Sequence, residues 1–361
     1  MTAVTANRAP RSLAAGSPMR GQLRPFLAIS GVTLFASIVV SAFLMPLVYM
    51  TSTAFKNESQ TSTPGAPLYP AAAETFTFEG EEFPVFQVPT ENGMQAWALI
   101  EPHRETSVFI DPQNVEAGPI TWEGRWRTLE QNWAFALDTS NFTRAWDVLD
   151  FPRMLFNTFA IAALSTIGAV ASAICVAYGF SRFRFPGRNG LFLLMLATII
   201  LPFQVTLIPT YAVYFAFGWV GTWLPLIIPH FFANAYNVFL LRQYFLTIPR
   251  DLDEAAMIDG AGPFRILRSV IIPQAIPAIV AVTLFHFFWA WNEYFLPLVY
   301  LQSAPDLQPL SVGLGRFNAL YSAEPTVVQA AALMAMALPM IIFFFAQRAF
   351  MRGVVFGGVE K

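Results

Sequence analysis

The sequence predicts an all-α integral membrane protein with six transmembrane helices and a small β-rich insert between the first two. The first observation is composition. Of 361 residues, 55% are hydrophobic and only 12% are charged, whereas soluble proteins carry about 25% charged residues. The second is that six apolar stretches reach the length of about 20 residues that a helix needs to cross the hydrocarbon core. The third is a polar interruption after the first stretch, at residues 51–152.

The first predicted span is an uncleaved anchor. It follows the basic segment MRGQLR, as the apolar part of a signal peptide would. Its apolar run is longer than the apolar region of a signal peptide, which has about 7 to 15 residues. We therefore predict that this segment is not cleaved and stays in the membrane. The six predicted spans cover residues 27–50, 155–180, 191–213, 219–241, 275–300 and 328–347.

The distribution of basic residues predicts that both termini are cytoplasmic. With six spans, the inner segments are 1–26, 181–190, 242–274 and 348–361, and they hold 14 of the 21 Lys and Arg residues. Short loops decide orientation, and the short loop SRFRFPGR carries three arginines. The predicted organisation is a cytoplasmic tail (1–26), a first span (27–50), an extracytoplasmic insert (51–152), a five-helix core (153–350) with a cytoplasmic loop at 242–274, and a cytoplasmic tail (351–361).

Residues 51–152 differ in character from the rest of the chain. They hold fifteen Asp and Glu residues, many Pro and Gly residues, and alternating runs such as TFTFEGEEFPVFQV and TSVFI. Alternation of this kind is typical of half-buried strands. His103 is the only histidine of this segment, and no catalytic constellation is legible in it. We therefore predict a structural or docking module outside the membrane, not an enzyme.

The rare residue types argue against a cofactor or a nucleotide site in this chain. Cys175 is the only cysteine, so one chain can build neither a disulfide nor a cysteine-based metal site. Lys56 and Lys361 are the only lysines, and neither follows a glycine-rich loop. A phosphate-binding loop of the form G-x-x-x-x-G-K-[ST] is therefore missing. We predict that the chain has no metal, no cofactor and no nucleotide hydrolysis of its own.

A short polar segment, DLDEAAMIDGAGPFRILRSVIIP at 251–273, interrupts the apolar runs. Asp251 and Glu254 have the spacing of a capping box, which predicts a helix beginning there. Asp259 and Gly260 predict its end, because glycine adopts the left-handed conformation common at helix C-termini. A second helix is predicted from Gly262-Pro263. Such a compact pair could be a docking projection, or an interfacial helix pair lying on the bilayer.

The same segment resembles the EAA loop of permease subunits of binding-protein-dependent ABC importers. The pattern reads Glu254-Ala255-Ala256, Gly260, Val270 and Ile272-Pro273, with two aliphatic swaps at Val270 and Ile272. Other runs resemble the carbohydrate-type, maltose-transporter-like members: AYGFSRFRFPGRN, LLRQYFLTIPRDLDEAAMIDGAG, WAWNEYFLPLVYL and the tail RGVVFGGVEK. The resemblance covers residues 25–50 and 153–361 but not the insert. Glu360 departs from the family's basic residue after the tail valine.

The resemblance implies a MetI-like permease fold in a bacterial inner membrane. It also implies the partners: a second permease subunit, two copies of an ABC ATPase that bind ATP and Mg²⁺, and an extracytoplasmic solute-binding protein, with no nucleic acid. The helix at 252–258 would sit in a groove of the ATPase. Glu254 and Asp259 would take polar partners there, and Ala255, Ala256 and Gly260 would keep the contact close. Alanine is also simply a strong helix former.

Polar residues inside the predicted spans are candidates for a solute pathway, since such residues are costly in a membrane and tend to face the bundle interior. His230, Asn234 and Asn237 have the spacing of one helical stripe, and His286 and Glu293 are seven residues apart. Trp289 and Asn292 accompany the second pair, and Gln204 lies between Pro202 and Pro209 in a span expected to be kinked. The alternative is hydrogen bonding between helices.

Three functions are compatible with these observations. The EAA loop favours the permease subunit of an ATP-driven importer for a sugar or related polar solute. The intramembrane His286 and Glu293 would also fit an ion-coupled transporter or channel that acts without ATPase partners. A membrane-anchored receptor or enzyme acting through residues 51–152 is the third.

Overall fold

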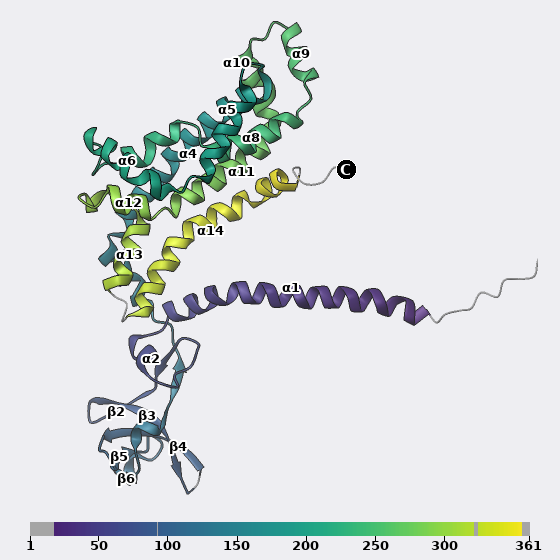
Figure 1. Ribbon diagram of the computed structural model, residues 1–361. Helices are drawn as coiled ribbons and strands as arrows, with labels where there is room; N and C mark the ends of the chain where they lie inside the picture. The colour runs from purple at the N-terminus through teal and green to yellow at the C-terminus, as the bar shows by residue number, and fades with distance from the viewer. Residues whose placement is uncertain (1–17, 92, 321–323, 356–361) are drawn as a thin grey trace, which may run out of the picture. The chain divides into compact units, whose positions relative to one another are not determined.

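The computed structural model describes residues 18–91, 93–320 and 324–355 (Figure 1). The chain divides into two compact units, Met1–Ser52 and Thr53–Lys361. The described residues of the first unit belong to the long helix α1 (Pro18–Ala54). The most apolar window of this helix has no buried side chain. A helix with apolar side chains on every face is stable in hydrocarbon, because its backbone groups are hydrogen-bonded within the helix.

Within the described residues, five helical segments are long and apolar enough to cross a membrane, or six if one bent pair counts as a single span. The five are Ile29–Ala54, Phe151–Arg182, Leu224–Thr247, Pro263–Trp291 and Pro325–Gln347. The bent pair is Arg188–Ile200 with Phe203–Ala216, and the bend is 96°. The predicted fold class, a helical membrane protein with an insert that contains strands, is confirmed.

The helices of the second unit follow in chain order after α1. The bounds are α2 Glu58–Ser62, α3 Ser140–Leu149, α4 Phe151–Arg182, α5 Arg188–Ala197, α6 Phe203–Ala216, α7 Leu224–Ile227, α8 Ala235–Thr247, α9 Asp251–Ile258, α10 Pro263–Ile266, α11 Ile272–Trp291, α12 Phe295–Tyr300, α13 Leu310–Leu320 and α14 Pro325–Val355.

Three of the predicted spans are interrupted. The third is bent at Leu201-Pro202, because a proline ring cannot continue the helix that precedes it. The fourth runs through α7 and a 3₁₀ turn, η4 (Ile228–Phe231), and becomes helical again only at α8. The fifth, expected at 275–300, stops at the end of α11 and restarts as α12. Apolar composition predicted where the spans lie, and the prolines predicted a kink in the third, but the breaks in the fourth and fifth spans were not predicted.

The helices α4, α8 and α11 pack around one apolar core. Small side chains lie where they meet: Ala173 and Ala177 on α4, and Ala275 and Ala278 on α11, are all buried. Larger residues of α8, such as Leu241 and Phe245, complete the cluster. Small residues at an interface let helix backbones approach closely, which is how helices associate in a membrane.

Gly168 of α4 marks a further close approach, to the η4 turn. A Cβ atom placed on Gly168 would lie 2.5 Å from the ring of Phe231 in η4. We expect Gly168→Ala to destabilise the protein by about 1 kcal/mol, the lower end of the cost of overpacking, because the Phe231 ring is 47% exposed and can move in part. Thermal unfolding in detergent measures this. Gly179→Ala is the matched control on the same helix, since a Cβ there meets nothing within 4 Å. An equally low melting temperature in both variants would contradict the packing argument.

The insert is built on an antiparallel sheet of six strands in the order β2-β3-β4-β5-β6, with β7 paired to β3. A separate two-stranded ribbon joins β1 and β8. The strand bounds are β1 Ala71–Ala73, β2 Thr75–Phe78, β3 Glu81–Thr90, β4 Gly93–Glu101, β5 Thr106–Ile110, β6 Ile120–Glu123, β7 Glu130–Gln131 and β8 Trp133–Phe135. The alternating runs thus form strands, as predicted.

Both faces of the sheet carry apolar clusters. Val88, Trp97 and Phe109 belong to one, with Trp122 and Trp126 packed against it. Val85, Ala98 and Ile110 form the core of the other. Successive residues of a strand point to opposite faces. Neighbours such as Trp97 and Ala98, or Phe109 and Ile110, therefore belong to different clusters.

The two ends of the insert lie together. The side-chain amide of Asn141, in α3, donates to the carbonyl oxygens of Ala54 at 3.0 Å and Lys56 at 2.8 Å. The rings of Phe55 and Phe142 are 4.9 Å apart. The segment by which the chain enters the insert is therefore hydrogen-bonded to α3, the helix by which the chain leaves it.

Candidate functional site

The cytoplasmic loop predicted from the sequence is a helical hairpin, which we call the coupling loop (Asp251–Ile271). Its first helix is α9, and its second, α10, continues through a π-helical turn (Leu267–Ile271) into α11. The predicted capping box is wrong. Arg250 is the N-cap residue, Asp251 is already helical, and no side chain caps this end. Three acidic residues in the first turn instead complement the positive end of the helix dipole.

Gly260 ends α9 as predicted. Its φ of 76° is in the left-handed region, which favours glycine. The N–H of Gly260 donates to the Met257 carbonyl at 3.0 Å, and that of Ala261 to the Ala256 carbonyl at 2.9 Å. This pair of bonds is a Schellman motif, which satisfies carbonyls at the end of the helix. Gly260 thus fixes the angle at which the chain leaves α9.

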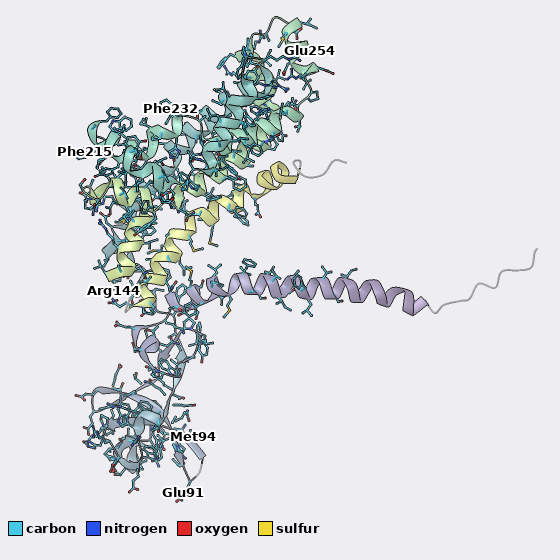
Figure 2. All side chains as sticks on the ribbon, viewed as in Figure 1. Glu91, Met94, Arg144, Phe215, Phe232 and Glu254 are labelled. Carbon is cyan, nitrogen blue, oxygen red and sulfur yellow. The ribbon has the colours of Figure 1, made fainter. Side chains whose placement is uncertain are left out.

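The outer face of α9 is free of packing against the rest of the unit. Glu254, Ala255 and Asp259 are exposed, whereas Ala256 is half-buried and packs against the core of α4, α8 and α11. Figure 2 shows Glu254 on α9, at the end of the bundle. Large apolar side chains lie beside it: Ile258 is 87% exposed and Phe264 is 76% exposed. An exposed apolar patch beside a charged rim is typical of a protein interaction site.

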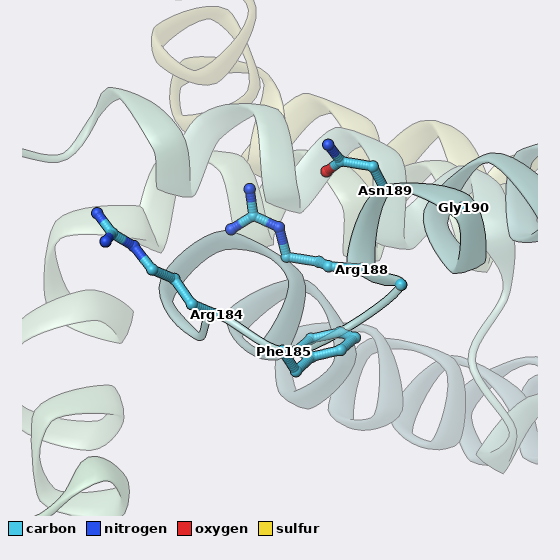
Figure 3. A pocket seen from close by; sticks show the side chains of 6 residues that line it. Arg184, Phe185, Arg188, Asn189 and Gly190 are labelled. Atoms are coloured by element: carbon cyan, nitrogen blue, oxygen red, sulfur yellow. The ribbon is translucent and has the colours of Figure 1, made fainter.

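The turn between α4 and α5 bears two basic side chains, those of Arg184 and Arg188. Arg184, Phe185 and Arg188 line a hollow of about 380 Å³. In Figure 3 the guanidinium groups of Arg184 and Arg188 and the amide of Asn189 lie on one side of the turn, with the Phe185 ring on the other. Arg188 also donates to the Phe183 carbonyl at 3.2 Å, which holds the turn closed.

A polar and aromatic cluster lies where η4, α8 and α11 meet. The ring centroids of His230 and His286 are 5.0 Å apart, and those of His230 and Trp289 are 5.6 Å apart. The Asn237 amide nitrogen lies 3.1 Å from Nδ1 of His286. Nε2 of His286 is buried and has no hydrogen-bond partner among the described residues. Four of the predicted pathway residues are thus brought together: His230, Asn237, His286 and Trp289.

Two hollows adjoin this cluster. A small one of about 30 Å³ is lined by Ser165, His230, Trp289 and Glu293, among others. An open one of about 670 Å³ is lined by Trp289, Asn292, Glu293 and neighbouring aromatic residues. Trp289 and Glu293 therefore line both. Among the described residues, no group of three or more His, Cys, Asp or Glu side chains is placed to hold a metal ion.

The expected spacings within single helices are wrong, although most of the residues still meet. The stripe through His230, Asn234 and Asn237 does not exist, because the chain is not helical between η4 and α8. Asn234 instead caps α8, accepting from the N–H groups of Tyr236 and Asn237 at 3.0 and 3.2 Å. Its role is therefore to begin a helix.

Glu293 does not share a helical face with His286, because α11 ends at Trp291. Its Oε1 accepts from the N–H groups of Phe295 and Leu296 at 3.0 and 3.1 Å, which caps α12. Asn292 is the C-cap residue of α11, and its amide donates to the Phe288 carbonyl at 2.7 Å. Both side chains hold the break between two helices at the edge of the larger hollow.

Gln204 is not part of the cluster. It lies in the first turn of α6, just after the 96° bend, and it is exposed. The predicted kink of this span is present, at Leu201-Pro202. Pro209 lies inside α6.

The family described as "Binding-protein-dependent transport system inner membrane component" matches residues 165–355, more than half of the chain. The chain belongs to this family. The matched range contains the coupling loop and the polar cluster, and it leaves the insert outside.

Curated relatives of this inner membrane component are named as permeases. The osmoprotective compounds uptake permease protein GgtD of Synechocystis is 36% identical over 206 residues, which cover 57% of this chain and 69% of GgtD. The sn-glycerol-3-phosphate transport system permease protein UgpE of Agrobacterium fabrum is 36% identical, covering 56% and 72% of the two chains. A probable ABC transporter permease of Pyrococcus horikoshii is 32% identical, covering 63% and 83%. This permease is accordingly a transport subunit and not an enzyme.

A solved structure shares the fold of the permease. It is a chain of a bacterial ABC transporter involved in the import of the acidic polysaccharide alginate, with a TM-score of 0.63 and 22% identity. The match covers 91% of this chain and 96% of that chain. The MetI-like architecture expected from the EAA resemblance is thereby confirmed at the level of fold.

Two residues that sequence reasoning missed form a contact between the inner side of the coupling loop and α4. Asp253, one position before the EAA triplet, is buried and lies 2.9 Å from Nε of Arg182 at the end of α4. The only signal in the sequence was the presence of a charge at each position. A pair 71 positions apart cannot be joined from one sequence, because nothing in the local pattern records which segments meet.

Proposed function

We propose that this permease is the membrane subunit of an ATP-driven importer and forms half of the translocation pathway for a sugar or related polar solute. An extracytoplasmic binding protein delivers the solute. Two copies of a separate ABC ATPase supply the energy through the coupling loop, and a second permease subunit completes the pathway. In this arrangement both termini and the coupling loop are cytoplasmic, in a bacterial inner membrane.

The exposed face of α9 is the observation that carries the proposal. Glu254 and Ala255 lie on a short helix whose exit is fixed by the Schellman motif at Gly260. Small side chains allow a partner groove to close over the helix, and the carboxylate supplies a polar anchor. The neighbouring Ile258 and Phe264 add apolar area that contact with a partner would bury.

The polar cluster and its hollows support a hydroxylated solute. Amide, imidazole and carboxylate groups can exchange hydrogen bonds with hydroxyls, and the Trp289 face can pack on the apolar C–H surface of a sugar ring. The relatives point to the same chemistry, since one is named for osmoprotective compounds and another for sn-glycerol-3-phosphate. We assign His230, Asn237, His286 and Trp289 to the pathway.

Reconstitution in liposomes tests the proposal. The chain is purified with its partner permease and ATPase, and uptake of radiolabelled sugars and polyols is measured with ATP inside and binding protein outside. We expect uptake only when ATP, ATPase and binding protein are all present. Uptake by this chain alone, driven by a proton or sodium gradient, would contradict the proposal and favour the ion-coupled transporter that His286 and Glu293 would also fit.

A further inference from the structure

The last turn of α4 is bonded to the coupling loop through a buried ion pair. Nε of Arg182 lies 2.9 Å from Oδ2 of Asp253, and the two side chains are only 6% and 9% exposed. The N–H is not aligned for a hydrogen bond, so the contact is ionic. Arg182 also donates from Nη2 to the Ile248 carbonyl at 3.1 Å. The Arg182 guanidinium thus contacts both the segment that leads into the loop and the inner face of α9.

Two further contacts join the same turn of α4 to the loop. The Tyr178 hydroxyl donates to the Pro263 carbonyl, at the start of α10, at 3.1 Å. Arg250, the N-cap residue of α9, donates from Nη2 to the Ser181 carbonyl at 3.3 Å. Residues 178–182 therefore contact the loop before α9, on α9 and after it.

The outer and inner faces of α9 consequently have separate tasks. Glu254 and Ala255 are exposed, whereas the adjacent Asp253 is buried against α4. A charge buried in this way is stable only while its partner is present. The identity of residue 253 is therefore set by α4, not by a partner protein bound at the outer face.

The other end of the contact leads to the polar cluster. Along α4, Ser172 donates to the His230 carbonyl at 3.3 Å, and Gly168 packs under the Phe231 ring. Ser165, one turn further, lines the smaller hollow beside His230 and Trp289. A single helix thus runs from the buried ion pair to the candidate solute pathway.

We propose that the Arg182–Asp253 pair is the joint through which displacement of α9 moves α4, and with it the η4 turn that holds His230. Both are positioning residues for transport. The inference rests on the function proposed above and adds a buried ionic contact to the hydrogen bonds of Tyr178 and Arg250 and to the covalent continuation of the loop into α8 and α11. Without this ion pair, ATP hydrolysis is uncoupled from transport. The ATPase still binds and hydrolyses ATP, but less solute is moved per ATP.

The test compares variants in the assembled importer, reconstituted with its ATPase and binding protein. Arg182→Met with Asp253→Leu removes the joint and leaves no unpaired buried charge, so the chain is expected to insert and assemble. We expect uptake per ATP hydrolysed to fall about tenfold, within the range of coupling between sites. Each single substitution leaves one charge buried alone and is expected to lower the amount of inserted protein. Arg184→Met, on the exposed turn nearby, is the control and keeps the wild-type ratio.

An unchanged ratio of uptake to hydrolysis in the double variant would overturn the inference. If that variant fails to assemble, Arg182→Lys decides, because it keeps the charge but lacks the planar fork that reaches both Asp253 and Ile248. A lowered ratio in Arg182→Lys supports the joint, and an unchanged ratio overturns it. Failure of the function proposed above is distinguishable, since the wild-type complex itself would then show no ATP-dependent uptake.

Discussion

Glu254→Lys is expected to abolish ATP-driven uptake while leaving insertion of the chain unchanged. The Glu254 side chain is exposed on α9, so its replacement removes no packing within the permease. A reversed charge facing the ATPase groove costs about 3 kcal/mol or more, which weakens association at least about a hundredfold. Pull-down of the ATPase by tagged permease measures association, and vesicle uptake measures its consequence.

Asp251→Lys is the matched control for Glu254→Lys. It makes the same charge reversal on the same helix, at an exposed position outside the EAA pattern. We expect it to retain ATPase association. Normal association and uptake in Glu254→Lys would remove the outer face of α9 from the coupling mechanism, and with it the main support for an ATP-driven importer.

Trp289→Ala is expected to lower uptake about tenfold while ATPase association stays intact. Trp289 lines both hollows, and its ring contacts those of His230 and His286. Removing it deletes two aromatic contacts of about 0.5–1.5 kcal/mol each and the flat surface on which a sugar ring would pack. Uptake is measured at several solute concentrations in proteoliposomes of equal permease content.

Asn234→Ser is the control for Trp289→Ala, and it distinguishes the residues of the solute pathway from the polar residues around them. Serine also caps helices, so α8 keeps its first turn. Because the Asn234 side chain holds backbone N–H groups of α8, we expect this variant to transport normally. If Trp289→Ala transports as well as Asn234→Ser, the cluster around Trp289 serves only to pack helices.

The membrane spans could be predicted from the sequence because their signal is local. A run of apolar residues by itself predicts a span in lipid, and alternation of apolar and polar residues by itself predicts the half-buried strands of the insert. The kink of the third span was expected from its prolines, but the breaks in the fourth and fifth spans were missed, since hydropathy does not record which side chains cap helices. Asn234 and Glu293 are polar residues in apolar surroundings, and the sequence does not distinguish a helix-capping side chain from a solute ligand.

The candidate site could be predicted in part for the same reason. His230 and His286 were identified because a charged or polar group in a membrane is conspicuous, although the assumed helical stripes were wrong. Asp253 was overlooked because it lies among other acidic residues, where it reads as one more solvated charge. Asp253 is buried because Arg182, on another helix, pairs with it. The sequence does not record that these two helices meet.

The bonding of both ends of the insert by Asn141 has an evolutionary consequence. Segments whose ends lie close together can be inserted into a protein, or lost from it, with little disturbance of the host. Here the carbonyls of Ala54 and Lys56 meet α3 directly, so a short turn could replace everything between them. The insert could therefore be lengthened, shortened or replaced without altering the helices that it joins.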